Sequence, residues 1–145
     1  MTTLINNPNA AMRQNSFLDG DAADVHEFVT SGAVEKGQAV AATISGGIPV
    51  VATATSATAA IVGVALESKG TGKVVKVATG GIAAIQASGT SVAAGTAFSI
   101  TSGGRVTTVA ATLNNKAMGW MLEASGTTAG DLKLAYIQPC LVAAS

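Results

Sequence analysis

Hydrophobic positions along the chain fall in short runs that are separated by turns containing glycine. The runs are rich in valine, isoleucine and threonine, and each is five to seven residues long. β-Branched residues in runs of this length, bounded by glycine, are typical of the strands of a sandwich or barrel. The sequence therefore predicts an all-β fold, with strands at residues 25–29, 38–44, 48–54, 61–67, 74–78, 82–87, 96–100, 106–110, 119–123 and 132–137.

The order of these runs and turns occurs twice. A slip of one residue would turn every strand inside out, and glycine supplies the positive φ of a tight hairpin, so constant spacing has a physical cause. The pattern predicts a small β-barrel or β-tulip-like body made of two tandem β-rich repeats. At an offset of 56 to 58 residues, Ser31-Gly32 matches Ser88-Gly89, Gly37 matches Gly95, Gly46-Gly47 matches Gly103-Gly104, residues 63–67 match 119–123, and Gly72 matches Gly130.

The predicted repeats divide the chain into three parts. Residues 1–24 are polar, rich in turn formers and without a period, and we interpret them as an extended N-terminal arm. The first β unit covers residues 25–81 and the second covers residues 82–145. We expect the two units to form one compact body, which contains either one barrel or two.

Each unit also holds one stretch that resembles a strand less than its neighbours do. Residues 55–60 and 112–117 lie between matched strands, and the first is rich in alanine and threonine. A serine or threonine that caps an alanine-rich run can start a helical turn. The pattern is compatible with one helical turn or with a loop.

The composition favours a core of small side chains. Of the 145 residues, 48% are hydrophobic, but alanine inflates that fraction and only 3% are aromatic. Small side chains bury less area than leucine or phenylalanine, so each contributes less to stability. Burial of further surface against other copies of the chain would compensate. The composition therefore favours a homo-oligomer.

Charge and hydropathy exclude two classes of partner. The formal net charge is zero and 11% of the residues are charged, so no basic field is available to bind nucleic acid. Residues 37–66 carry no charge, but Gly46-Gly47 and Pro49 would interrupt a helix. The N-terminus lacks the basic and apolar regions of a signal peptide. We therefore expect no membrane partner and synthesis in the cytoplasm.

Residue types that carry catalysis or bind metals are scarce. His26 is the only histidine and Cys140 the only cysteine, so they cannot assemble a metal site or a disulfide within the chain. We expect His26 to face solvent from its strand. No turn combines the glycines, lysine and following helix of a phosphate-binding loop, and no nucleophile-elbow motif is present. The sequence predicts a protein that is not an enzyme and that needs no cofactor or metal.

Two matched positions are interpreted as structural. Glu67 and Glu123 hold the same place in the two repeats, whereas catalytic carboxylates normally occupy different surroundings that separate their pKa values. Trp120 aligns with Val64 inside the matched strands, which predicts that Trp120 packs in the core.

Five short stretches of the chain follow one another in a recognisable order. They are Gly-Gln-Ala-Val at 37–40, Gly-Gly at 46–47, Val-Gly-Val-Ala-Leu-Glu at 62–67, Gly-Lys-Val-Val-Lys-Val at 72–77 and Gly-Gly-Ile at 80–82. Together they resemble the capsid cement proteins of tailed phages, also called head decoration proteins, and the resemblance covers most of residues 30–139. It implies a compact β-barrel or β-tulip fold, a homotrimer, and a position at local three-fold axes on the outer face of the capsid.

The resemblance predicts a viral structural protein that decorates and stabilises the outer surface of a phage capsid by clamping neighbouring major capsid subunits. Its place would be the exterior of the virion, after synthesis in the host cytoplasm. Ordering a free arm costs roughly 1–2 kcal/mol per residue, which burial of apolar side chains on a capsid lattice can offset. We therefore expect the arm to bind the capsid through Leu4, Ile5, Pro8, Met12, Phe17 and Leu18.

Two other functions fit the same β-rich sequence. One is a surface adhesin, in which loops of the β units bind glycan or protein. The other is a module of a viral tail or fibre, in which trimers would assemble end to end.

Overall fold

The computed structural model describes residues 23–110 and 116–141, and these residues form strands and loops without a helix. The predicted all-β fold is confirmed. The predicted arm lies almost entirely outside the described residues, as do residues 111–115. The strands are β1 (Ala23–Thr30), β2 (Ala39–Ser45), β3 (Ile48–Thr53), β4 (Ile61–Ala65), β5 (Val74–Gln86), β6 (Ala97–Ile100), β7 (Val106–Thr108), β8 (Lys116–Met121) and β9 (Leu132–Leu141).

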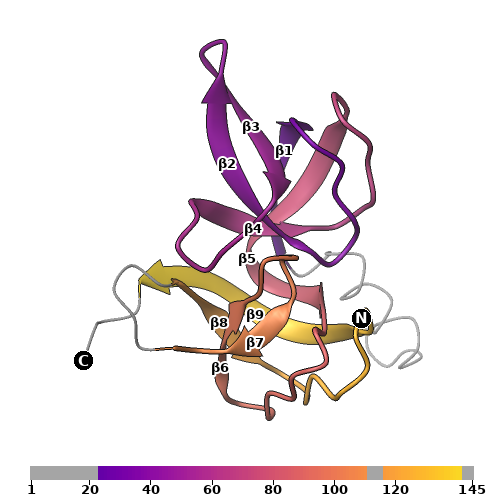
Figure 1. Ribbon diagram of the computed structural model, residues 1–145, viewed down its shortest axis with the longest axis vertical. Helices are drawn as coiled ribbons and strands as arrows, with labels where there is room; N and C mark the ends of the chain where they lie inside the picture. Colours follow the sequence, from indigo (N-terminus) through magenta and orange to yellow (C-terminus); the bar gives the residue numbers. More distant parts are fainter. Residues whose placement is uncertain (1–22, 111–115, 142–145) are drawn as a thin grey trace, which may run out of the picture.

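The first five strands close into a ring. Their order is β1-β3-β2-β4-β5, and β5 also pairs with β1. Every pair is antiparallel except β1 and β3, which run parallel where Val29 and Thr30 face Val50 and Val51. This ring, with the long hairpin of β2 and β3 at its end, forms the upper part of the molecule in Figure 1.

The remaining strands repeat this pairing scheme. The order continues as β5-β9-β8-β6-β7, and a parallel bridge between Ala87 and Val106 brings β7 back to the chain that leaves β5. The second half of β5 therefore takes the role that β1 has in the first ring. Both rings share β5, which passes from the upper group of strands to the lower one in Figure 1.

The continuity of β5 corrects one prediction. The sequence predicts two strands, at 74–78 and 82–87, separated by the Gly80-Gly81 pair, but the structure has a single strand of 13 residues. Gly81 has a positive φ of 87° and still pairs with Ala23 on one side and Ile137 on the other. Pairing on both sides keeps the strand continuous through the glycines. The predicted boundary between residues 81 and 82 falls inside this shared strand.

Hydrogen bonds of the backbone match between the two rings. Gly37 N donates to Ala65 O at 2.8 Å, and Gly95 N donates to Met121 O at 2.7 Å. These bonds confirm the internal repeat that the glycine spacing predicts. Further equivalent pairs are Ala65 N to Gln38 O with Met121 N to Thr96 O, Leu66 N to Lys76 O with Leu122 N to Leu134 O, and Gly72 N to Thr30 O with Gly130 N to Ala87 O.

Two clusters of buried side chains form the core. Because successive side chains of a strand point to opposite faces, neighbouring residues of one strand can belong to different clusters. Val40 and Ala65 belong to a small valine-rich cluster, while their neighbours Ala39 and Val64 join a larger cluster that also contains Phe98 and other residues of β6 to β9. The outer face of the first ring at β2 and β4 is therefore buried against the second ring.

A polar network joins the rings beside this apolar interface. Gln86 is 6% exposed, and its Oε1 accepts a hydrogen bond from Arg105 Nε at 2.8 Å. Its Nε2 donates to the carbonyl oxygen of Lys36 at 2.8 Å, and its backbone N donates to Gly37 O at 2.8 Å. One buried side chain thus connects the end of β5, the residue before β7 and the loop before β2.

Candidate functional site

The residues predicted to bind a capsid lie outside the part of the chain that the structure describes. This applies to Leu4, Ile5, Pro8, Met12, Phe17 and Leu18. The candidate surfaces of the described chain therefore belong to the body, residues 23–110 and 116–141.

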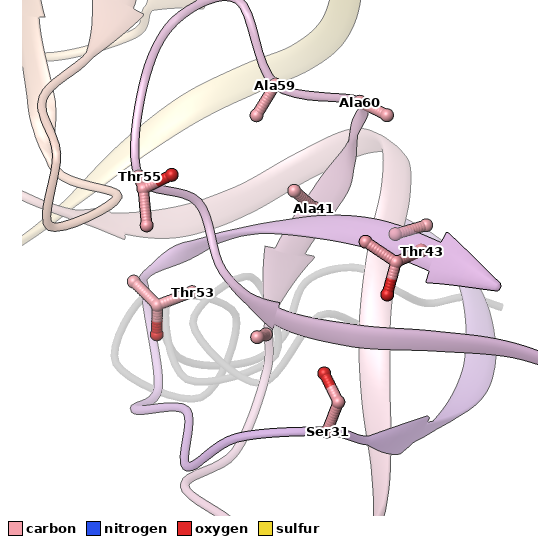
Figure 2. Close-up of a pocket in the computed structure, with 9 residues that line it drawn as sticks. Ser31, Ala41, Thr43, Thr53, Thr55, Ala59 and Ala60 are labelled. Atoms are coloured by element: carbon pink, nitrogen blue, oxygen red, sulfur yellow. The ribbon is translucent and has the colours of Figure 1, made fainter. Parts of the chain in front are cut away.

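One candidate is a hollow of about 410 Å³ beside the β2–β3 hairpin. Figure 2 shows short side chains from the hairpin and from the following loop around it. The lining side chains end in methyl and hydroxyl groups, so the hollow offers shape and a few hydrogen-bonding groups but no group for acid–base catalysis. The lining residues are Ser31, Ala41, Ala42, Thr43, Ala52, Thr53, Thr55, Ala59 and Ala60.

Part of that lining comes from residues 55–60, for which the sequence was compatible with either a helical turn or a loop. Residues 54–60 form a loop with a turn at residues 57–58. The hydroxyls of Ser56 and Thr58 are 2.9 Å apart, and Ala59 N donates to Ser56 O at 3.3 Å. The local hydrogen bonds of serine and threonine thus compete with a helix in this stretch.

His26 lies on β1 and is exposed, as predicted. Within the described residues, no group of three or more His, Cys, Asp or Glu side chains is placed to hold a metal ion. In the same part of the chain, no helix is long and apolar enough to cross a membrane.

Glu67 and Glu123 make equivalent hydrogen bonds to the backbone in the two rings. Glu67 Oε2 accepts a hydrogen bond from Lys76 N at 3.1 Å, and Glu123 Oε2 accepts one from Leu134 N at 2.9 Å. In each ring the carboxylate ties the end of one strand to the backbone of the next. This geometry agrees with the structural role predicted for the pair.

The prediction that Trp120 packs in the core is wrong. Trp120 is 40% exposed, and its ring stacks on that of Tyr136 with 4.5 Å between centroids and 11° between planes. The alignment with Val64 is correct, because Val64 pairs with Ala39 and Trp120 pairs with Ala97 at the same register. Val64 is fully buried by the second ring. The described residues place no further ring over the equivalent face at Trp120.

A second exposed apolar site lies at the tip of the β2–β3 hairpin. Ile44 is 71% exposed and Ile48 is 59% exposed, on either side of the Gly46-Gly47 turn. The hairpin projects from the body at the top of Figure 1. The sequence pattern places these isoleucines in strands but does not predict their exposure. Exposure depends on how the rest of the chain packs around the hairpin.

A protein of similar fold is found by comparison with solved structures. The crystal structure of the N base of head fiber gp8.5 in bacteriophage phi29 matches with a TM-score of 0.59 and 18% sequence identity. The match covers 79% of this chain and 93% of that one. No family model matches the chain, and no curated protein matches its sequence. The likeness thus establishes a shared fold.

Proposed function

We propose that this chain is a structural protein of a bacteriophage virion, which binds the outer surface of the head and stabilises the shell by contacting neighbouring major capsid subunits. The observation that carries the proposal is the fold shared over 79% of the chain with the N base of a phage head fiber protein. The resemblance of most of residues 30–139 to capsid cement proteins, which rests on five stretches between residues 37 and 82, points the same way independently of the structure.

The body of the chain supports a structural role rather than a catalytic one. Two small rings share one strand and one apolar interface, which is a rigid arrangement for a protein that must hold two neighbours at a fixed distance. The hollow beside the β2–β3 hairpin has no titratable group in its lining. Repetition of weak contacts over a capsid lattice would give tight binding through multivalency.

The direct test uses empty heads of the phage that encodes the chain, prepared without this protein. Purified chain is added, unbound protein is removed by sedimentation, and the heads are imaged by cryo-electron microscopy. The proposal predicts added density on the outer face that bridges capsid subunits, and a higher temperature of head disruption. Heads without added density would refute it.

The predicted arm contact is tested in the same assay. A chain lacking residues 1–22, and a chain with Phe17→Ser and Leu18→Ser, should occupy the heads at least tenfold more weakly. The matched control changes two polar residues of the same stretch, Gln14→Ser and Asn15→Ser, and should bind as the unaltered chain does. If all four proteins bind equally, the contact belongs to the body instead.

The alternatives predict different outcomes. A surface adhesin would bind a glycan array and leave the heads bare. A tail or fibre module would assemble end to end and would not bind the shell at separate sites.

A further inference from the structure

Because the chain contains an internal repeat, equivalent surfaces occur in both rings. In the first ring this surface is buried, and in the second ring it is exposed. In the first ring, Ala39, Val64 and Ala78 lie side by side across β2, β4 and β5, because Val64 pairs with both of the others. In the second ring, Ala97, Trp120 and Tyr136 lie side by side across β6, β8 and β9 in the same register. The two rows are called the covered row and the open row.

The two rows differ in what lies over them. All three residues of the covered row are 0% exposed, and they share a core cluster with residues of the second ring. In the open row, Ala97 is exposed and Trp120 is 40% exposed. The chain shortly after each row shows the same contrast, since Leu66 is 9% exposed and its counterpart Leu122 is 43% exposed.

The turn between β6 and β7 is part of what meets the covered row. Gly104 O accepts a hydrogen bond from Ala39 N at 2.8 Å. A Cβ on Gly104 would lie 2.6 Å from Ala39 O and 3.2 Å from Thr53 Cγ2, so the turn packs directly against the start of β2. A glycine turn at a hairpin tip thus contacts the first residue of the covered row.

The counterpart of that turn in the first ring is the tip of the β2–β3 hairpin. A Cβ added at Gly46 or Gly47 would meet nothing within 4 Å, and Ile44 and Ile48 beside them are exposed. This hairpin is also longer, since twelve residues separate Val40 from its partner Thr53, whereas nine separate Phe98 from Thr108 in the second ring. The shorter β6–β7 hairpin contacts the covered row of its own chain, whereas the longer β2–β3 hairpin projects away from the body.

We propose that the β2–β3 tip of one copy docks on the open row of a second copy, repeating between chains the contact that the β6–β7 turn makes within one chain. Two large isoleucines would then cover the exposed Trp120 and its neighbour Leu122. Such a contact is heterologous, because it joins different surfaces of the two copies, and it leads to a closed ring or a linear chain of copies. It does not depend on the proposed function.

The test uses the full-length chain and two variants that each remove one side of the contact. The tip variant carries Ile44→Ser and Ile48→Ser, and the row variant carries Ala97→Arg, which leaves Trp120 in place as the only tryptophan. Sedimentation velocity over a range of concentrations measures association, and the emission of Trp120 reports its removal from water. Matched controls are Val74→Ser for the tip and Ala129→Arg for the row, both at exposed positions.

The unaltered chain and both controls should associate, with the emission of Trp120 moving to shorter wavelength as concentration rises. Each variant alone should associate at least tenfold more weakly. An equal mixture of the two variants should form a dimer that grows no further, because only one competent contact remains. This rescue by mixing distinguishes a heterologous contact from a symmetric one.

Three results would overturn the proposal. They are a monomeric unaltered chain at the highest concentration, a tip variant that associates as strongly as the unaltered chain, and a mixture of variants that stays monomeric. Far-ultraviolet circular dichroism and the unfolding midpoint check that each variant folds. If Ala97→Arg does not fold, Leu122→Ser replaces it on the same surface.

Discussion

Gly63 in β4 and Gly119 in β8 occupy the same place in the two repeats, and neither place has room for a side chain. A Cβ at Gly63 would overlap the carbonyl oxygen of Ala78, and a Cβ at Gly119 would overlap that of Tyr136. Ala78 and Tyr136 are matched positions as well. The repeat therefore conserves a close approach of two backbones at this place. The pairing register also shifts next to each glycine, between β2 and β4 at Gly63 and between β8 and β9 at Gly119.

Replacement of either glycine by alanine should therefore destabilise the fold. Forcing a methyl group against a backbone carbonyl costs about 1–3 kcal/mol. Gly119 also has a φ of 132°, which adds roughly 1–3 kcal/mol for any other residue. Urea unfolding should show a loss of stability for Gly63→Ala and a larger one for Gly119→Ala.

Gly70→Ala is the matched control for these variants. Gly70 is exposed and directly precedes the turn at residues 71–72, and an added Cβ there would meet nothing within 4 Å. Its replacement should change the free energy of unfolding by less than about 0.5 kcal/mol. Equal stability of Gly63→Ala and Gly70→Ala would contradict the close approach of β4 to β5.

Gln86 should be required for the junction of the two rings. Gln86→Leu keeps the volume but leaves Arg105 Nε and the carbonyl oxygen of Lys36 without this partner, which costs about 1–3 kcal/mol. Thermal unfolding measures the loss. The same change at the exposed Gln138 should have little effect, and a Gln86→Leu protein as stable as Gln138→Leu would argue against the network.

Glu123 should stabilise the second ring through its hydrogen bond to Leu134 N. Glu123→Ala removes the acceptor and should cost about 0.5–1.5 kcal/mol, whereas Glu123→Gln keeps an oxygen in place and should lose less. The equivalent pair of changes at Glu67 should show the same order in chemical denaturation. If the alanine and glutamine variants are equally stable, the side-chain oxygen does not stabilise the ring through this hydrogen bond.

Removal of the hydroxyl oxygen of Ser125 should lower the stability of the fold. The side chain is fully buried, and its Oγ accepts a hydrogen bond from Val92 N at 2.8 Å and donates one to Thr90 O at 3.1 Å. Ser125→Ala leaves two backbone groups without this partner, at a cost of about 1–3 kcal/mol. Ser102→Ala, in an exposed turn, serves as the control and should unfold at the same denaturant concentration as the unaltered chain.

Several features of this chain followed from local pattern alone. The β-branched runs and their glycine boundaries predicted the strands, and the constant offset between glycines predicted the repeat. Spacing can determine these features because strand alternation and turn conformation depend on residues that are close in sequence. The equivalence of Glu67 and Glu123 belongs to the same class, since it required only the alignment of the two units.

Other features depended on which surfaces meet. The Gly80-Gly81 pair marks a turn by composition, yet β1 and β9 pair with Gly81 from both sides and keep β5 continuous. Val64 and Trp120 share one position in the repeat, but the second ring covers only Val64.

The sequence by itself therefore determined the strands, the turns and the two-fold repetition. Only the tertiary structure decided that the two units close as separate rings sharing β5, and that one copy of their common interface lies open at Trp120. The physical reason is that burial depends on the whole arrangement of the chain in space, whereas the strand pattern depends on each residue and its near neighbours.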